Sequence, residues 1–467
     1  MNNKKLLLIR TDAIGDYILF RNFIKILAQS ERYKDYKIDI LCHKSWYELS
    51  RELDKKHINN FFSFDIEKYK LDNWYKTNLQ NKLNFQKYDI LIHPTYSRTF
   101  LVDTLISNIK AKVKIGNSGD LLNISLEDKN ISDKYYTKLI NSEDKYLFEF
   151  NRNKVFFEKL LNKDIKINKT SIKYKSFIAP PFSNYVVFVI AANASKRKWS
   201  IQNYVTLARN LYNLGYEIVL CGGDSELKEV ENFKALFGNK FINLVGKTSL
   251  IDILNILNYS EFVISNDTGL AHISIALKKQ TYIISNGNHF GRFVPYPKHF
   301  SSYVECFCPF DYQKDKYFFL EKYYQGSNLD INEIKVNQIF DFLNLLKKDK
   351  KYRFNYKLFD MVVTNNEKIN FSKQFNKLYE QLNHLDTNLV IYGNGTIGKT
   401  IQALIPDKIV GYVDIADEKN HPKNLKNMKY DKIIISVLGR EEEIIKYLVE
   451  ELKINNQKII TLELENE

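Results

Sequence analysis

The chain has 467 residues, of which 44% are hydrophobic, so it is long enough for two or three domains with cores of their own. Its formal net charge is +14, but only 11 of its 69 basic residues are Arg, the residue favoured for bidentate phosphate recognition. We therefore expect no nucleic-acid partner. Four Cys residues do not make a disulfide framework, and no apolar run approaches the roughly 20 residues that span a bilayer.

The amino terminus predicts a cytoplasmic protein. Met1–Lys5 lead directly into an apolar strand, without the small-residue cleavage site of a signal peptide. A composition biased to Lys, Asn and Ile accounts for most of the positive charge. The same charge also favours contact with an anionic membrane, so we expect a location in the cytoplasm or peripherally at the inner face of the inner membrane.

The first predicted element is a strand, Leu6–Arg10, which runs into a Gly-Asp turn and a helix, Tyr17–Ala28. In parallel α/β sheets, ligands bind at the carboxyl ends of the strands. Asp16 lies at such an end and is a candidate general base. The alternative is that Asp16 caps the helix. Asp12 is the second candidate for the base.

The rest of the first domain is less regular. Residues 61–88 are rich in aromatic side chains, which predict either ordinary packing or a platform for an acceptor sugar; packing is the simpler interpretation. Ala179–Pro181 is the expected interdomain linker, because proline favours extended backbone. We therefore predict an amino-terminal Rossmann-like acceptor domain at 1–178 and a Rossmann-like donor domain at 179–349.

The second domain alternates strands with amphipathic helices, the rhythm of a parallel sheet. The predicted strands are 185–192, 217–221, 241–245, 262–265 and 281–285. The predicted helices are 201–213, 226–237, 250–257, 269–277 and 331–349.

The most informative segment is Ser265–His272, which follows one of these strands and opens a helix. Such a turn points backbone N–H groups and the positive helix end at a ligand. Asp267 and His272 add an anion and an imidazole, and Thr268 and Gly269 complete the turn. This combination suits a ligand with a diphosphate and hydroxyl groups, such as a sugar nucleotide. The alternative is that Asp267 caps the helix and His272 packs against it.

Six segments together, in this order, resemble the signature of glycosyltransferase family nine, the bacterial heptosyltransferases of lipopolysaccharide synthesis. They are Leu6–Asp16, Tyr88–His93 with Ser97 and Arg98, Lys196–Trp199 with Tyr204, Leu220–Glu226, Leu244–Leu250 and Ser265–His272. The resemblance covers roughly residues 4–346. It implies a GT-B architecture, in which two Rossmann-like domains face a cleft, and it implies that Asp16 activates the acceptor hydroxyl.

The resemblance also implies how the leaving diphosphate is stabilised. A basic residue just before the Trp has this role in the family, and here Lys196, Arg197 and Lys198 all qualify. The chain has no D-x-D pair for a metal ion, so we expect no metal and no required cofactor. Glu226 is a candidate for the donor ribose or, alternatively, a first-turn acid. Arg292, with His289, is a candidate for the diphosphate or the sugar.

The carboxyl-terminal part lies outside the resemblance. Residues 350–384 predict a helical connector, and 385–467 predict a small Rossmann-like domain. Its G-x-G-x-x-G, made of Gly393, Gly395 and Gly398, follows a strand, and Asp414 ends the next strand at the spacing of a dinucleotide site. The alternative is that the glycines serve only the tight turn.

We therefore expect an inverting, metal-independent glycosyltransferase. Its donor would be a nucleotide-sugar, with ADP-heptose as the first candidate, and its acceptor a saccharide or lipid-linked saccharide such as the lipopolysaccharide core. Two alternatives remain open. One is a non-catalytic protein that binds sugar nucleotides or acts as a scaffold; the other is a fusion whose tail binds a dinucleotide.

Overall fold

The chain forms two compact units, Met1–Phe340 and Asp341–Glu467. The computed structural model describes residues 4–142, 146–174, 177–190, 192, 194–297, 300, 303–348, 382, 385, 387–437 and 440–462. The predicted helical connector, 350–384, therefore lies outside the described residues except for Leu382.

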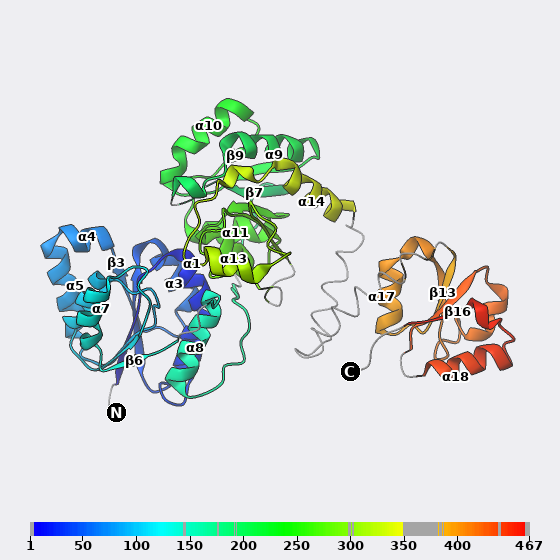
Figure 1. The fold of residues 1–467 in the computed structure, drawn as a ribbon, viewed down its shortest axis with the longest axis horizontal. Coiled ribbons are helices and arrows are strands. Elements are labelled where there is room, and N and C mark those ends of the chain that lie inside the picture. The colour runs from blue at the N-terminus through cyan, green and yellow to red at the C-terminus, as the bar shows by residue number, and fades with distance from the viewer. Residues whose placement is uncertain are drawn as a thin grey trace. The chain divides into compact units, whose positions relative to one another are not determined.

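The first half of unit 1, residues 4–174, is a doubly wound parallel sheet (Figure 1). Its strand order is β3-β2-β1-β4-β5-β6, the order expected of a Rossmann fold. The strands are β1 (Lys5–Arg10), β2 (Lys37–His43), β3 (Asn60–Phe64), β4 (Tyr88–His93), β5 (Ala111–Asn117) and β6 (Lys138–Ile140). The helices are α1 (Ile14–Phe20), α2 (Asn22–Ala28), α3 (Tyr47–Asp54), α4 (Ile66–Leu71), α5 (Asn73–Phe85), α6 (Phe100–Ser107), α7 (Leu126–Ser132) and α8 (Glu149–Leu161).

The first helix differs from its predicted bounds. α1 begins at Ile14, with Ala13 as its N-cap, and the chain breaks at Arg21 before α2. The Arg21 guanidinium is held by Asp54 and by the carbonyl of Ser171, which fixes this break. Asp16 therefore lies in the first turn of α1 and is not its cap, so the capping alternative for Asp16 is wrong.

Ordinary packing accounts for much of the aromatic segment. Phe64 and Tyr69 are buried with ring centroids 5.2 Å apart. The Tyr75 hydroxyl donates to the carbonyl of Ser63. Trp74 and Phe85, in contrast, are 73% and 81% exposed and contribute little to the core.

The second half of unit 1, residues 177–340, repeats the topology. Its sheet order is β12-β11-β10-β7-β8-β9, and all of its strands are parallel. When the strands are counted along the chain from β7 and the order is read from β9, this is the same 3-2-1-4-5-6 order as in the first sheet. The strands are β7 (Tyr185–Val189), β8 (Glu217–Leu220), β9 (Ile242–Asn243), β10 (Val263–Asn266), β11 (Thr281–Ile284) and β12 (Val304–Phe307). The helices are α9 (Ile201–Asn213), α10 (Leu227–Phe237), α11 (Leu250–Tyr259), α12 (Gly269–Ala276), α13 (Lys316–Tyr323) and α14 (Val336–Lys348), the last of which continues into unit 2.

Capping residues explain why some helices of this half begin and end where the sequence predicts. Ser200 caps α9 through the N–H of Asn203, and Gly215, at φ +86°, follows the helix end, so α9 has its predicted bounds. The predicted helix at 331–349 starts later, at Val336, after a 3₁₀ turn at Ile331–Glu333. The sixth strand, β12, was not among the predicted elements.

The two halves of unit 1 share a hydrophobic core. Buried side chains of α1, α2 and α8 belong to the same cluster as those of α11 and α12. Phe148, which precedes α8, packs edge-on against Tyr296 and Phe300 of the second half, at centroid distances of 4.9 and 5.0 Å. This shared core sets the positions of the two sheet edges relative to each other.

Unit 2 is a small parallel α/β domain, as predicted, with its own buried clusters. Its strand order, β14-β13-β15-β16, is the 2-1-3-4 order of flavodoxin-like sheets. The strands are β13 (Leu389–Tyr392), β14 (Ile409–Val413), β15 (Lys432–Ile435) and β16 (Ile459–Thr461). The helices are α17 (Thr396–Leu404) and α18 (Glu441–Lys446), and a π-helical turn at Tyr447–Glu451 follows α18.

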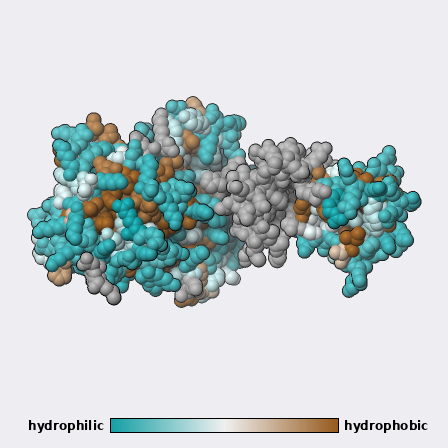
Figure 2. Space-filling view, turned by 90° about the horizontal axis from the view of Figure 1, so that it is seen from below, coloured by the Kyte–Doolittle hydropathy of each residue, from teal (hydrophilic) through white to brown (hydrophobic). Residues whose placement is uncertain are grey.

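The described surface is mostly hydrophilic, although hydrophobic residues gather on one face of unit 1 (Figure 2). Among the exposed large hydrophobic side chains of the first half are Leu121 and Leu122, between β5 and α7, and Leu126, the first residue of α7. None of the helices described has the length and apolar character needed to cross a membrane.

Candidate active site

The centre of the candidate site is the contact between α1 of the first half and α12 of the second. A Cβ atom added at Gly15 would lie 2.7 Å from the His272 ring, and one added at Gly269 would lie 2.7 Å from the Ile14 side chain. These two positions have no room for a larger residue. The contact brings Asp16 and the Asp267–His272 turn, which are about 250 residues apart in the sequence, to the same place.

Asp267 does not cap α12, so the capping alternative for this residue is also wrong. The N-cap is Thr268, without a side-chain capping bond, and the Thr268 hydroxyl is 3.1 Å from that of Ser265. The Asp267 carboxylate instead accepts from Arg197 Nη2 at 2.7 Å, and its other oxygen is 3.8 Å from His272 Nε2.

His272 is a neutral imidazole at neutral pH, because burial lowers its pKa to about 4. Its Nδ1 is 2.6 Å from the hydroxyl of Tyr296, a buried residue between β11 and β12. Sequence reasoning missed Tyr296, since nothing near it in the chain marks a polar role. Together with Phe148 and Phe300, Tyr296 holds the imidazole ring against α1.

The three basic residues before Trp199 contact different partners. Lys196 Nζ donates to Asn328 at 3.1 Å, and Lys198 pairs with Glu229 of α10. Only Arg197 reaches the start of α12, where it donates to both the carboxylate and the backbone carbonyl of Asp267. Of the three candidates, Arg197 therefore lies at the turn that the sequence predicts to bind the donor.

Glu226 is held by its own turn. Oε2 accepts from the N–H of Gly223 at 2.8 Å, and Oε1 accepts from the Ser225 hydroxyl at 2.6 Å. The structure thus places Glu226 as a local capping acid at the start of α10. Its role toward a ribose stays a prediction.

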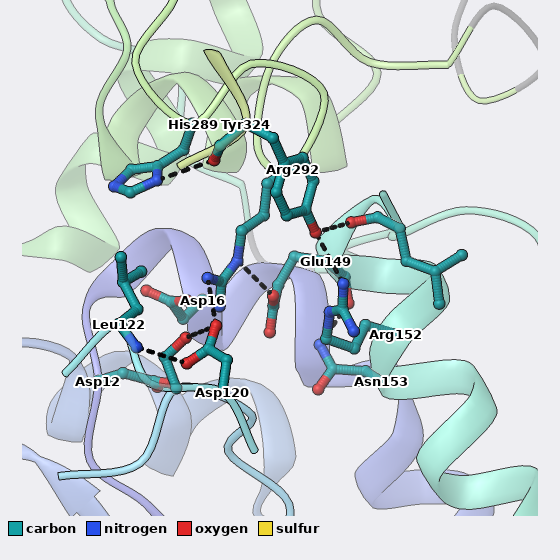
Figure 3. A network of polar contacts seen from close by, with 12 residues as sticks. Asp12, Asp16, Asp120, Leu122, Glu149, Arg152, Asn153, His289, Arg292 and Tyr324 are labelled. Carbon is teal, nitrogen blue, oxygen red and sulfur yellow. Dashed lines mark hydrogen bonds and ion pairs between the residues drawn. The ribbon is translucent and has the colours of Figure 1, made fainter. Parts of the chain in front are cut away.

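Asp16 belongs to a dense network of charges (Figure 3). The fully buried Arg10, at the end of β1, lies 2.8 Å from Asp12, 3.8 Å from Asp16 and 3.4 Å from Glu149. Arg10 also donates to Asn153 at 2.8 Å. Asp16 keeps 20% of its side-chain surface exposed. The buried residues of the network therefore contact it on its interior side, and its carboxylate remains accessible.

Arg292 enters this network from the second half. Figure 3 shows its guanidinium between Asp16, Asp120 and Glu149, with Nε 3.1 Å from Glu149 and Nη1 3.6 Å from Asp120. The sequence predicts that Arg292 faces the donor. The structure shows it paired with carboxylates of the first half instead, while His289 Nδ1 is 3.2 Å from the carbonyl of Tyr324.

The electrostatics of this network favour a proton on Asp16. Burial, and then the neighbouring Asp12, raise the pKa of Asp16 to about 8, against the opposing effect of Arg10. Burial also raises the pKa of Asp12. Burial would raise the pKa of Glu149 too, but Arg292, Arg10 and Arg152 outweigh it and hold that pKa below its usual value. Of these three carboxylates, Asp16 is therefore the one that gains or loses a proton most easily.

In the part of the chain that the structure describes, no group of three or more His, Cys, Asp and Glu side chains is placed to hold a metal ion. The carboxylates around Asp16 are instead interleaved with guanidinium groups. The prediction that no metal is needed stays open to experiment.

The tail turn shows what its glycines do. Gly393 has φ +103°, and a Cβ added at Gly398 would lie 2.0 Å from the carbonyl oxygen of Gly393. Asp414 accepts from the N–H groups of Asn394 at 2.7 Å and Ala416 at 2.9 Å. Gly393, Gly398 and Asp414 thus build the tight turn, which is the simpler of the two interpretations. Gly395 alone has open space around its Cβ position.

Two Rossmann-like halves with a shared polar site where their sheet edges meet define the GT-B class of glycosyltransferase folds. Solved structures of this class match the chain at low identity. A family 9 glycosyltransferase from Veillonella parvula DSM 2008 aligns with a TM-score of 0.58 and 17% identity, covering 75% of this chain and 99% of that one. The E. coli heptosyltransferase WaaC with ADP gives 0.56, 16%, 73% and 99%, and the E. coli ADP-heptose lps heptosyltransferase II gives 0.51, 17%, 74% and 99%.

Residues 76–296 match the sequence model of glycosyltransferase family 9 (heptosyltransferase), which confirms the predicted resemblance. A curated relative, lipopolysaccharide heptosyltransferase 2 from Salmonella typhimurium, is 28% identical over 87 residues. That match covers 18% of this chain and spans a quarter of the relative's length.

Proposed function

We propose that the protein transfers a sugar from a nucleotide-sugar to a saccharide acceptor, with inversion at the anomeric carbon and without a metal ion. The observation that carries the proposal is the α1–α12 contact, which brings the candidate base Asp16 to the turn made by Asp267, Thr268 and Gly269.

In the proposed step, Asp16 takes the proton of an acceptor hydroxyl, and the hydroxyl oxygen forms a bond to the anomeric carbon. The bond from that carbon to the diphosphate breaks, and the nucleoside diphosphate leaves with the bonding electrons. A single displacement of this kind inverts the anomeric configuration. Asp16 must be ionised to take this proton, so we expect the rate to rise with pH up to about 8; once ionised, a carboxylate with a pKa of about 8 is a stronger base than an ordinary Asp.

The leaving diphosphate needs positive charge. The amino-terminal end of α12 offers its N–H groups and the positive end of the helix dipole. Arg197 lies at the same end, where it is paired with Asp267 at 2.7 Å. We propose that Arg197 turns from Asp267 to the diphosphate when the donor binds, which would supply the charge that a metal ion supplies in D-x-D transferases.

Donor and acceptor are proposed by analogy with the solved and curated relatives. One of these was solved with ADP, and another is described as using ADP-heptose, so ADP-heptose is our first candidate for the donor. The curated relative is a lipopolysaccharide heptosyltransferase, so the lipopolysaccharide core is our first candidate for the acceptor. A lipid-linked acceptor lies at a membrane, and we propose that the protein works in the cytoplasm, peripherally at the inner face of the inner membrane, drawn there by its net charge of +14.

The test is to incubate the purified protein with a panel of nucleotide-sugars and truncated lipopolysaccharide acceptors, and to follow nucleoside diphosphate release and the anomeric configuration of the product. We expect transfer from ADP-heptose with inversion, and undiminished turnover in excess EDTA. Loss of turnover in EDTA that Mn²⁺ restores would overturn the metal-free step. Tight donor binding without transfer to any acceptor would favour the non-catalytic alternative.

A further inference from the structure

Glu149 occupies a special position in the network around Asp16. It is the first residue of α8, is 1% exposed, and its two carboxylate oxygens face two different halves of unit 1. Oε1 is 3.4 Å from Arg10 Nη2 of the first half, and Oε2 is 3.1 Å from Arg292 Nε of the second. Its own N–H donates to the carbonyl of Arg292 at 2.8 Å, which fixes the backbone on both sides of the bridge.

The charged groups around Asp16 come from several segments. β1 contributes Arg10, the following turn contributes Asp12, α8 contributes Glu149, and the second half contributes Arg292. Asp120, after β5, lies beside them and is 3.6 Å from Arg292 Nη1. α12 also packs against this part of α1, but its titratable residue there, His272, is neutral at neutral pH. Both guanidinium groups are thus divided between Asp16 and other carboxylates.

We propose that Glu149 is a positioning residue for sugar transfer: by holding Arg10 and Arg292 at once, it prevents either guanidinium from pairing closely with Asp16 and so preserves Asp16 as a base. This inference rests on the proposed function, because it deepens the role of Asp16 in that reaction. Glu149 itself, being buried beneath the network, is not expected to touch the substrate.

The distances support this division. Arg10 is 2.8 Å from Asp12 and 3.4 Å from Glu149 but 3.8 Å from Asp16, which is the longest of its three ion pairs. Without the carboxylate of Glu149, both guanidinium groups would lose a partner and move toward Asp16. A carboxylate paired closely with Arg has a lowered pKa, usually by about 1 to 3 units, and is a weaker base.

The experiment is the pH dependence of kcat/KM for the full chain and for Glu149→Gln, a substitution that keeps the shape of the side chain and removes its charge. We expect the ascending limb of the profile to move to lower pH by about 1 unit or more in Glu149→Gln, with plateau activity about 10-fold lower. Arg292→Gln removes a positive charge that faces Asp16, so its limb should move to higher pH. Opposite shifts from two partners of one ion pair are not expected from a general loss of packing.

Asp54→Asn is the matched control. Asp54 is also a buried acid in the first half, 2.8 Å from Arg21, but it lies outside the Asp16 network. Asp54→Asn should lower the melting temperature and leave the ascending limb of the kcat/KM profile at the same pH. If Glu149→Gln behaves like Asp54→Asn, losing stability with an unmoved limb, Glu149 is merely structural and the proposal is overturned.

A second measurement needs no turnover. The difference in unfolding free energy between each protein and the same protein carrying Asp16→Asn, followed against pH, reports the pKa of Asp16 directly. That pKa should fall when Glu149→Gln is introduced and rise when Arg292→Gln is introduced. An unchanged pKa in both backgrounds overturns the inference even if no donor is turned over, whereas absence of transfer by the unmodified chain contradicts only the proposed function.

Discussion

Asp16 combines two properties that a general base needs and that a merely structural carboxylate lacks. It is accessible at one edge, with 20% of its side chain exposed, and its environment raises its affinity for a proton. Asp12, the other candidate, is closer to Arg10 and is hydrogen-bonded to it at 2.9 Å. These contacts favour Asp16 over Asp12 as the general base, and substitutions at the two positions distinguish them.

Asp16→Asn should reduce turnover by at least about 100-fold, the usual contribution of a general base, because an amide cannot accept the proton of the acceptor hydroxyl. Donor affinity measured by calorimetry should remain, since Asp16 belongs to the first half of unit 1, which we propose binds the acceptor. Near-normal turnover in a folded Asp16→Asn protein would move the role to Asp12, for which Asp12→Asn is the matched variant.

Stability should depend on pH through Asp16 in a defined direction. Its folded pKa of about 8 is above the value near 3.8 of an ordinary Asp, so the folded state holds the proton over this range while the unfolded state releases it. The unfolding free energy of the unmodified protein, relative to Asp16→Asn, should therefore fall as pH rises from about 4 to about 8, by about 1 kcal/mol or more. Chemical denaturation at several pH values measures this, and an increase over that range would contradict it.

At the scale of elements, the α1–α12 crossing depends on two glycines whose Cβ positions are already filled by the opposite helix. This close crossing brings the Gly-Asp turn of the first half beside the Asp-Thr-Gly turn of the second. Changes at this crossing should act on stability and on donor binding together.

Gly15→Ala should place a methyl group 2.7 Å from the buried His272 ring. We expect a loss of about 1–3 kcal/mol in stability, the usual cost of overpacking, together with weaker donor binding. Gly395→Ala in unit 2 is the control, because its Cβ position has no neighbour within 4 Å and its φ of −71° suits any residue. Equal effects of the two substitutions on melting temperature and donor affinity would show that the crossing is not tightly packed.

At the scale of the whole molecule, unit 1 contains both halves of the candidate site, and unit 2 has its own parallel sheet and buried clusters. A protein truncated at about residue 350 should therefore fold and bind the same donor as the full chain, with an affinity within about 3-fold. Calorimetry on the two proteins tests this. A soluble, folded truncation that binds no donor would assign unit 2 to the active site.

Much of the fold could be predicted from local pattern. Alternation of apolar strands with capped amphipathic helices determined the parallel α/β class, and α9 has its predicted bounds because caps and glycines act within a few residues. The turn that carries Asp267 and His272 was recognisable for the same reason. β12 was missed because it follows a long irregular segment whose residues Tyr296 and Phe300 pack against Phe148 of the first half, a contact that no local pattern shows.

Local sequence pattern thus predicts the class of fold, the two turns that carry Asp16 and Asp267, and their resemblance to a transferase family. The packing of the two halves is needed to show that Arg197, among three basic neighbours, contacts Asp267, and that Arg292 pairs with carboxylates of the first half. It alone revealed Glu149, which pairs with Arg292 across 143 residues of chain. The physical reason is that helices, strands and caps are stabilised by neighbours in the sequence. The partners in a buried ion pair depend instead on which charged residues the packing of the two halves brings close together.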